Sequence, residues 1–70
     1  MRYFFDEISK IRISDIRGRE FNHNEAAIAH ARRLAADIRS LETAAERRNL
    51  SIHVHSEYGN AIHEERVFGE

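Results

Sequence analysis

The residues best suited to chemistry are three histidines in the C-terminal third of the chain, His53, His55 and His63, in the stretch SIHVHSEYGNAIHEE. His53 and His55 alternate with branched apolar residues, which is typical of a half-exposed β-strand. On such a strand the two imidazoles share one face with their backbones about 7 Å apart, within joint reach of one metal ion. A metal site needs a third ligand, and the register of the hairpin decides whether His63 supplies it.

That register depends on the length of the turn. A three-residue turn at 57–59 pairs Val54 with Ile62 and His53 with His63, whereas a turn of even length would turn Ile62 to solvent. Apolar matching favours the first register, which gathers the three histidines on one face. The same alternation describes an ordinary solvated strand, so we expect no bound metal or other cofactor and keep His53, His55 and His63 as metal candidates only. Imidazoles titrate near pH 6.5, so a metal- or pH-responsive module is one alternative function.

The sequence contains no recognisable catalytic motif. It has no cysteine, and no nucleophile elbow, glycine-rich phosphate loop, zincin motif or spaced carboxylate pair is present. A sheet with one helix also offers little depth for a pocket. We therefore expect no catalytic residues and no enzyme activity.

Length and charge describe one small domain spanning residues 1–70. A chain of 70 residues buries only about 60% of its unfolded surface, so its stability should be marginal. Without disulfides, a partner chain is a usual reinforcement. The net charge of −1, from 11 Lys and Arg against 12 Asp and Glu, argues against a nucleic-acid partner, because such binding needs a surplus of basic groups.

The sequence also lacks targeting signals. The N-terminal stretch MRYFFDEISK has no long apolar region of the kind found in secretion signals. No run approaches the roughly 20 apolar residues that span a bilayer. We expect a cytoplasmic protein with no membrane partner.

Two short strands should open the fold. Residues 2–8 form an aromatic strand with Tyr3 and Phe5 on one face and Phe4, Asp6 and Ile8 on the other. A turn at 9–10 leads into a half-buried strand at 11–16, forming an antiparallel hairpin. Gly18 can adopt a positive φ and turn the chain back over the core.

An amphipathic helix follows. Asn22 and Glu25 form an Asn version of the capping box, which satisfies the free amides of a first helical turn. Apolar residues then recur at helical spacing, at Ala27, Ala31, Leu34, Ile38 and Leu41.

Two endings are open for this helix. It breaks near Ser40, with Thr43 and Glu46 capping a short extra turn, or it continues to Arg48. We favour the break, because a helix to Arg48 would be roughly 37 Å long, whereas strands of seven residues span roughly 23 Å. A second hairpin then follows, with strands at 50–56 and 61–68 and Leu50, Ile52 and Val54 on its buried face. The pattern predicts an α+β domain of order ββαββ, a four-stranded antiparallel sheet with one helix packed on one face.

Four aromatic residues are candidates for an interface: Tyr3, Phe4, Phe5 and Phe68. Alternation prevents the first three from all facing the helix, and exposed aromatics on a small sheet indicate an interface. We therefore expect a small structural or protein-interaction module that forms a homodimer. Nucleic-acid binding, with bases stacked on Tyr3 or Phe5, is the main alternative.

Four motifs resemble a known group of proteins: RYFFD, DIRGREF, NEAA and I-x-V-x-x-E-x-G. Together they resemble a family of short bacterial proteins of unknown function, common in alphaproteobacteria. Its members open with the motif R-Y-[FY]-F-[DH], in which brackets enclose alternative residues at one position. The resemblance covers nearly the whole chain and implies two strands, one helix and two strands, with no activity to transfer. Members often have an Asp-Gly turn and a Pro-Asp helix start where this chain has EISK and NHNE.

Overall fold

The computed structural model describes residues 1–41 and 49–68. The elements are β1 (Arg2–Ile8), β2 (Arg12–Ile13), β3 (Arg19–Glu20), α1 (Asn24–Leu41), β4 (Ser51–Ser56) and β5 (Ala61–Arg66). All strand pairs are antiparallel in the order β2-β1-β4-β5, and β3 also pairs with β1.

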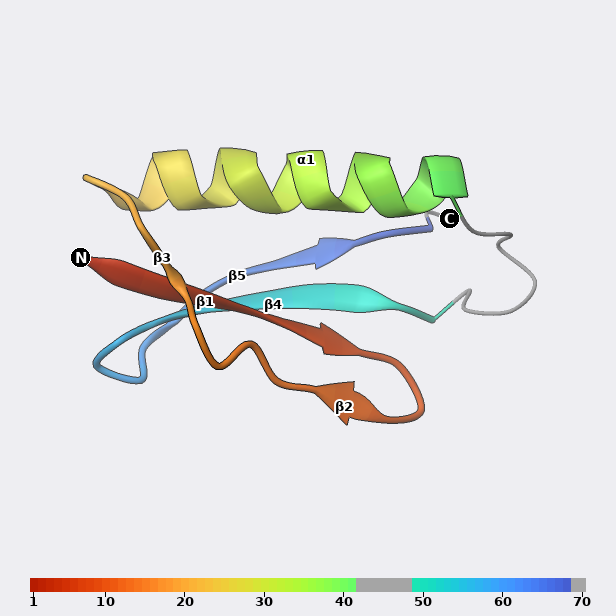
Figure 1. Cartoon of the computed structure of the whole chain (residues 1–70), viewed down its shortest axis with the longest axis horizontal. Coiled ribbons are helices and arrows are strands. Elements are labelled where there is room, and N and C mark those ends of the chain that lie inside the picture. Colours follow the sequence, from red (N-terminus) through yellow and green to blue (C-terminus); the bar gives the residue numbers. More distant parts are fainter. Residues whose placement is uncertain (42–48, 69–70) are drawn as a thin grey trace.

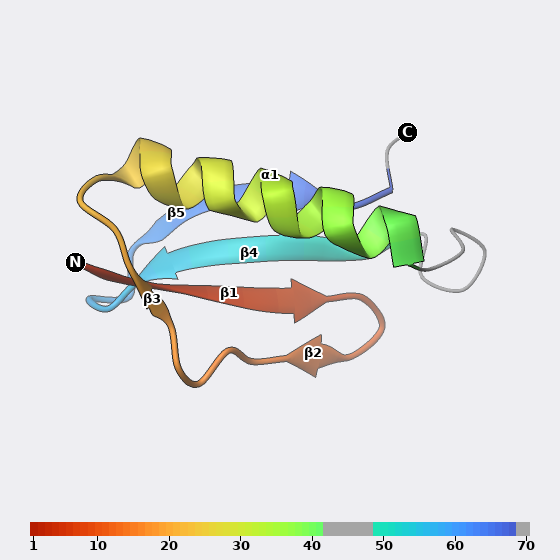
Figure 2. The ribbon, with the colours of Figure 1, turned by 45° about the horizontal axis from the view of Figure 1, so that its top comes forward.

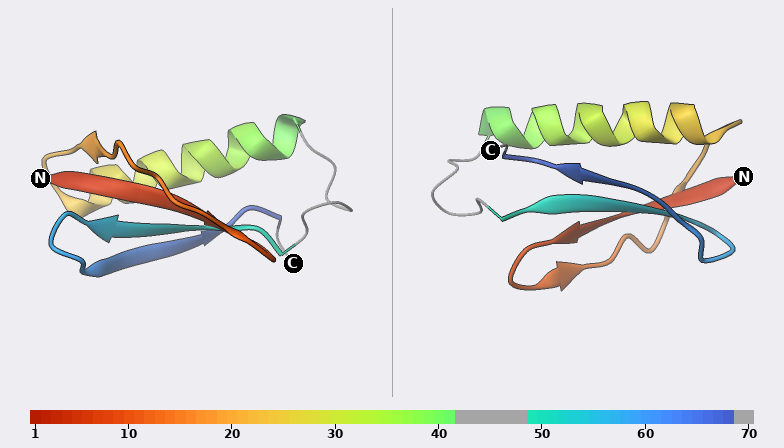
Figure 3. Two further views of the ribbon diagram at one scale, coloured as in Figure 1. Left: turned by 60° about the horizontal axis from the view of Figure 1, so that its bottom comes forward. Right: turned by 180° about the vertical axis from the view of Figure 1, so that it is seen from behind.

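The sheet and the helix form two layers. α1 lies over one face of the sheet, the helix face (Figures 1 and 2). No described element covers the opposite face, the open face, and Figure 3 (left) looks toward it with α1 behind. The predicted α+β class and ββαββ order are confirmed, with β3 as an additional short strand. No helix in the described segments is long and apolar enough to cross a membrane.

β1 is the aromatic strand and divides its side chains between the two faces as predicted. Tyr3 and Phe5 are buried under α1, with 2% and 8% of their surface exposed. The outer edge of β1 is shared by β2, the following loop and β3. β2 is shorter than the predicted 11–16, because Asp15 bends inward. Its carboxylate accepts the Phe5 N–H at 3.1 Å, and its own N–H donates to Asp6 at 2.9 Å.

α1 begins at Asn24, so the predicted cap at Asn22 is wrong by one residue. His23 is the cap: its Nδ1 accepts the Ala26 N–H at 3.2 Å, and its carbonyl accepts the N–H groups of Ala26 and Ala27. Asn24 is used differently, since its side-chain oxygen accepts the Tyr3 hydroxyl at 2.7 Å and ties the helix start to β1.

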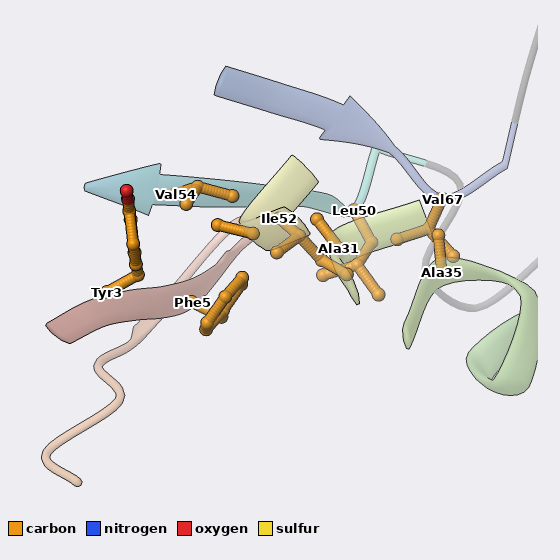
Figure 4. Close-up of a cluster of buried hydrophobic side chains, with 9 residues drawn as sticks. Tyr3, Phe5, Ala31, Ala35, Leu50, Ile52, Val54 and Val67 are labelled. Carbon is orange, nitrogen blue, oxygen red and sulfur yellow. The ribbon is translucent and has the colours of Figure 1, made fainter. Parts of the chain in front are cut away.

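The buried stripe of α1 is made of alanines, which let the helix approach the sheet closely. Ala27, Ala31 and Ala35 are fully buried, and Figure 4 shows Ala31 and Ala35 among the side chains of the sheet. Leu41, predicted to end the stripe, is 84% exposed and does not belong to the buried stripe. The capping box at 43–46 and the extension to residue 48 lie outside the described residues.

β4 supplies the predicted apolar row to the core. Leu50, Ile52 and Val54 are each 1% exposed, and Val67 beyond β5 is fully buried. The turn before β5 is also as predicted: Gly59 has φ +86°, and the Ser56 N–H donates to the Asn60 carbonyl at 3.0 Å.

The register of β4 and β5 differs from the prediction beyond this turn. His55 pairs with Ala61, but a β-bulge then shifts the register, so that Val54 pairs with His63 and His53 with Glu64. The predicted pairs His53–His63 and Val54–Ile62 are therefore wrong.

The bulge has a physical reason in the apolar residues of the last strand. Ile62 packs against the core, and Val67 reaches it too, with its N–H donating to the Leu50 carbonyl at 3.1 Å. These residues are five positions apart, so strict alternation would place them on opposite faces. One extra residue in the strand lets both face the helix.

Candidate functional site

The open face has a buried carboxylate at its centre. Asp6 is only 3% exposed although no element of the described residues covers this face. Its Oδ2 accepts a hydrogen bond from Arg12 at 2.7 Å and lies 3.3 Å from His55 Nε2, while its Oδ1 accepts the Asp15 N–H at 2.9 Å. These three groups take the place of solvent around the carboxylate.

The same partners set the ionisation of Asp6. Burial raises the pKa of Asp6, but the Asp15 amide, the Arg12 guanidinium and the His55 ring together lower it by more, so that the pKa lies below its ordinary 3.8. The carboxylate is therefore charged and committed to its partners at neutral pH. It ties β1 to β2 and β4.

An aromatic pair lies beside this carboxylate. The rings of Phe4 and His55 are stacked, with centroids 5.4 Å apart and an interplanar angle of 20°. They project from neighbouring strands, where Phe4 and His55 are register partners, and both are half-buried. The pair is a flat, partly exposed surface near the middle of the sheet.

A hollow of about 500 Å³ adjoins the pair at the β4–β5 hairpin. Small residues leave the space, since Ala61 faces His55 across the strands and Gly59 lies in the turn. Arg12, His53 and Glu64 also line it, and His53 Nε2 lies 3.6 Å from Glu64 Oε2. The open face thus combines an aromatic surface, a hollow lined by polar and apolar residues, and charges of both signs.

The structure divides the three predicted histidines between the two faces of the sheet, although all three border the hollow. His53 and His55 share the open face, but the bulge pairs His63 with Val54 on the helix face. There His63 Nε2 lies 2.7 Å from Glu65 Oε1, which also lies 3.7 Å from Arg32 of α1. Among residues 1–41 and 49–68, no three His, Cys, Asp or Glu side chains are placed to hold one metal ion.

The four aromatic interface candidates are also distributed between different environments. Tyr3 and Phe5 are core residues under α1, and Phe68 packs partly against that core. Phe4 is the one of the four placed on the open face by the alternation of β1.

Sequence reasoning missed two features of the surface. His30 packs edge-on against Phe5 at 4.9 Å between ring centroids and lies 5.3 Å from Phe21. The Asp6 network was also missed, although an acidic residue within an otherwise apolar and aromatic strand is a signal that could have found it.

Comparison with known proteins gives a family and no activity. A family model described as "Domain of unknown function (DUF6894)" matches residues 2–68. No curated protein and no solved structure matches the chain.

Proposed function

The chain belongs to this family of domains of unknown function, so its role has to be inferred from its own surfaces. We propose that it is an interaction module that binds a second copy of itself through the open face. The observation that carries this proposal is the stacked Phe4–His55 pair, half-buried on a face that no described element covers. When a partner removes half-buried rings from water, the burial of their apolar surface stabilises the complex.

The charges of the open face are compatible with such a pairing. Asp6 and Glu64 are balanced by Arg12 and Arg66, which project from the same face by register. Two copies related by a two-fold axis would therefore bring together surfaces without a net charge of one sign. We propose binding rather than catalysis because the Asp6 carboxylate is already hydrogen-bonded to Arg12 and to the Asp15 amide. The cytoplasmic location stays a prediction from the sequence.

The test is a mass measurement by light scattering at about 100 µM. We expect a dimer, and Ala61→Arg, which fills the hollow without removing a side-chain contact, should give a monomer. The matched control is Ala29→Arg, at an exposed position of α1, which should leave the dimer intact. A monomeric wild type, or an Ala61→Arg variant that stays dimeric, contradicts the proposal.

One observation favours a second candidate, single-stranded nucleic acid. The Phe4–His55 pair could stack a base, whereas Tyr3 and Phe5, the residues first considered for stacking, are buried. An amide NMR titration with a mixed oligonucleotide would distinguish the two, with shifts at Phe4 and His55 that do not depend on protein concentration. Self-association that changes between about pH 5 and 7 would instead favour the pH-responsive alternative.

A further inference from the structure

A second surface lies along the outer edge of the sheet, in residues 10–19, which we call the β2 edge. Ile11, Ile13 and Ile16 are exposed there by 67%, 48% and 89%. Three large apolar side chains so exposed within six residues form a local apolar patch on a small domain, and such patches mark interaction sites.

The β2 edge is also basic. Its exposed cations are Lys10, Arg17 and Arg19; Arg12 is also exposed, but its guanidinium pairs with Asp6 of the open face. Its one acid, Asp15, points inward, where Oδ1 accepts the N–H groups of Arg17 and Gly18 at 3.1 Å each and Oδ2 accepts the Phe5 N–H. Three positive charges against one inward-facing negative charge leave this surface with the opposite sign to the chain as a whole.

A groove adjoins the apolar side of this edge. It has a volume of about 300 Å³ and lies between the β2 edge and α1. Phe5, Ile13 and Leu34 contribute apolar surface to it. Arg19 and His30 also line the groove, and so do two acidic residues, Glu7 and Asp15. The groove therefore suits an apolar side chain of a partner, whose carboxylates would lie outside it beside the exposed cations of the β2 edge.

β2, which is two residues long, presents strand backbone at this edge. It is terminal in the strand order β2-β1-β4-β5, so within the described part of the chain its outer edge has no neighbouring strand. An extended peptide that adds to such an edge gains main-chain hydrogen bonds and places alternate side chains in adjacent pockets.

Charge decides which occupant suits the site. A second copy paired edge to edge would set Lys10, Arg17 and Arg19 of one chain against the same cations of the other, and like charges in an interface are repulsive. We propose that the β2 edge and its groove bind an extended acidic segment of a partner protein, one that alternates carboxylates with apolar side chains. This site is separate from the open face and does not depend on the chain being a dimer.

The experiment is an amide NMR and calorimetric titration of the full chain with a synthetic peptide of alternating Glu and Val. We expect saturable shifts at residues 11–16 and at Leu34, and affinity that falls as salt is raised. Two comparison peptides separate the contributions: alternating Lys and Val should not bind, and alternating Glu and Ser should bind at least about fivefold more weakly.

Matched variants locate the site. Ile16→Ser should weaken binding several-fold, whereas Leu41→Ser, which removes an equally exposed apolar side chain elsewhere, should not. Arg17→Glu should weaken binding by about tenfold, whereas Arg32→Glu, on the side of α1 that lies next to Glu65 of β5, should change it by less than about twofold.

Three results would overturn the proposal. One is the absence of saturable peptide binding, which would mean that the cations only protect an edge strand from aggregation. Another is an equal loss in the two Arg variants, and the third is binding of an oligonucleotide or of anionic vesicles at residues 11–16 in preference to the peptide. A monomeric protein in the mass measurement would contradict the proposed dimer and leave this site standing.

Discussion

Gly18 is the residue that lets the β2 edge run close to β1. Its φ is +70°, and a Cβ built on it would lie 2.8 Å from Phe4 Cε1 and 2.8 Å from the Tyr3 carbonyl oxygen. Gly59 has a similar φ of +86° but no atom within 4 Å of such a Cβ. Substitutions at the two glycines therefore distinguish the cost of backbone strain alone, at Gly59, from the cost of strain together with a steric clash, at Gly18.

We expect Gly59→Ala to cost about 1 kcal/mol of unfolding free energy, because it adds only the strain of a positive φ. Gly18→Ala should cost at least about 3 kcal/mol, because the Tyr3 backbone must also move. Urea denaturation of both variants and the wild type measures the two costs. Equal losses would show that the close approach at Gly18 is not a tight constraint.

Residue-level reasoning could predict the faces of the strands but not the partners of Asp6. Alternation placed Phe4 and Asp6 together on one face, and the structure agrees. What it could not supply is that Arg12 and the Asp15 amide come from a loop that leaves the β-ladder to reach Asp6. Such contacts depend on the path of an irregular segment, which has no periodic pattern to read.

At the scale of elements, the last hairpin shows where sequence reasoning stops. The row Leu50, Ile52 and Val54 lies at even spacing and was assigned correctly. Ile62 and Val67 lie at odd spacing, and both reach the core. The odd spacing of these two apolar residues in the sequence is a signal for a β-bulge. Pairing the strands by the single apolar match of Val54 with Ile62 overlooks this signal and wrongly places the three histidines on one face.

His30 is a titratable side chain that takes part in the packing of α1 on the sheet. Burial lowers the pKa of His30 from its ordinary 6.5, and Arg19 and Arg33 lower it further, against smaller effects of Asp15 and Asp37. In the unfolded chain the ring takes up a proton near pH 6.5. As the pH falls from there toward the lowered folded pKa, the unfolded state gains the proton first and stability falls.

We therefore expect the unfolding free energy of the wild type to fall between about pH 7 and pH 5, with a contribution from His30. His30→Phe keeps a flat ring against Phe5 and Phe21 but cannot titrate, so its stability at pH 7.5 should lie within about 1.5 kcal/mol of the wild type. The fall toward pH 5 should be smaller in the variant, as measured by urea denaturation at each pH. An identical fall in both proteins would contradict the role given to His30.

For the whole molecule, the question is how so small a core remains folded. The fully buried side chains of α1 are alanines, which contribute less apolar area than larger residues would. The larger apolar side chains of the core come from the sheet, led by Tyr3, Leu50 and Ile52. A second copy on the open face would add burial that the helix does not provide.

The contribution of a second copy to stability can be measured through the thermal midpoint of unfolding. If the folded state is a dimer and the unfolded state is not, mass action raises apparent stability with chain concentration, by about 1.4 kcal/mol per chain for a hundredfold increase. For a domain of this size that corresponds to about 5 to 10 °C between 5 and 500 µM. The Ala61→Arg variant should unfold at one temperature across the same range, because it removes association without touching the core beneath α1. A wild type whose midpoint is equally constant would mean that the core is sufficient alone and that the open face serves a partner other than a second copy.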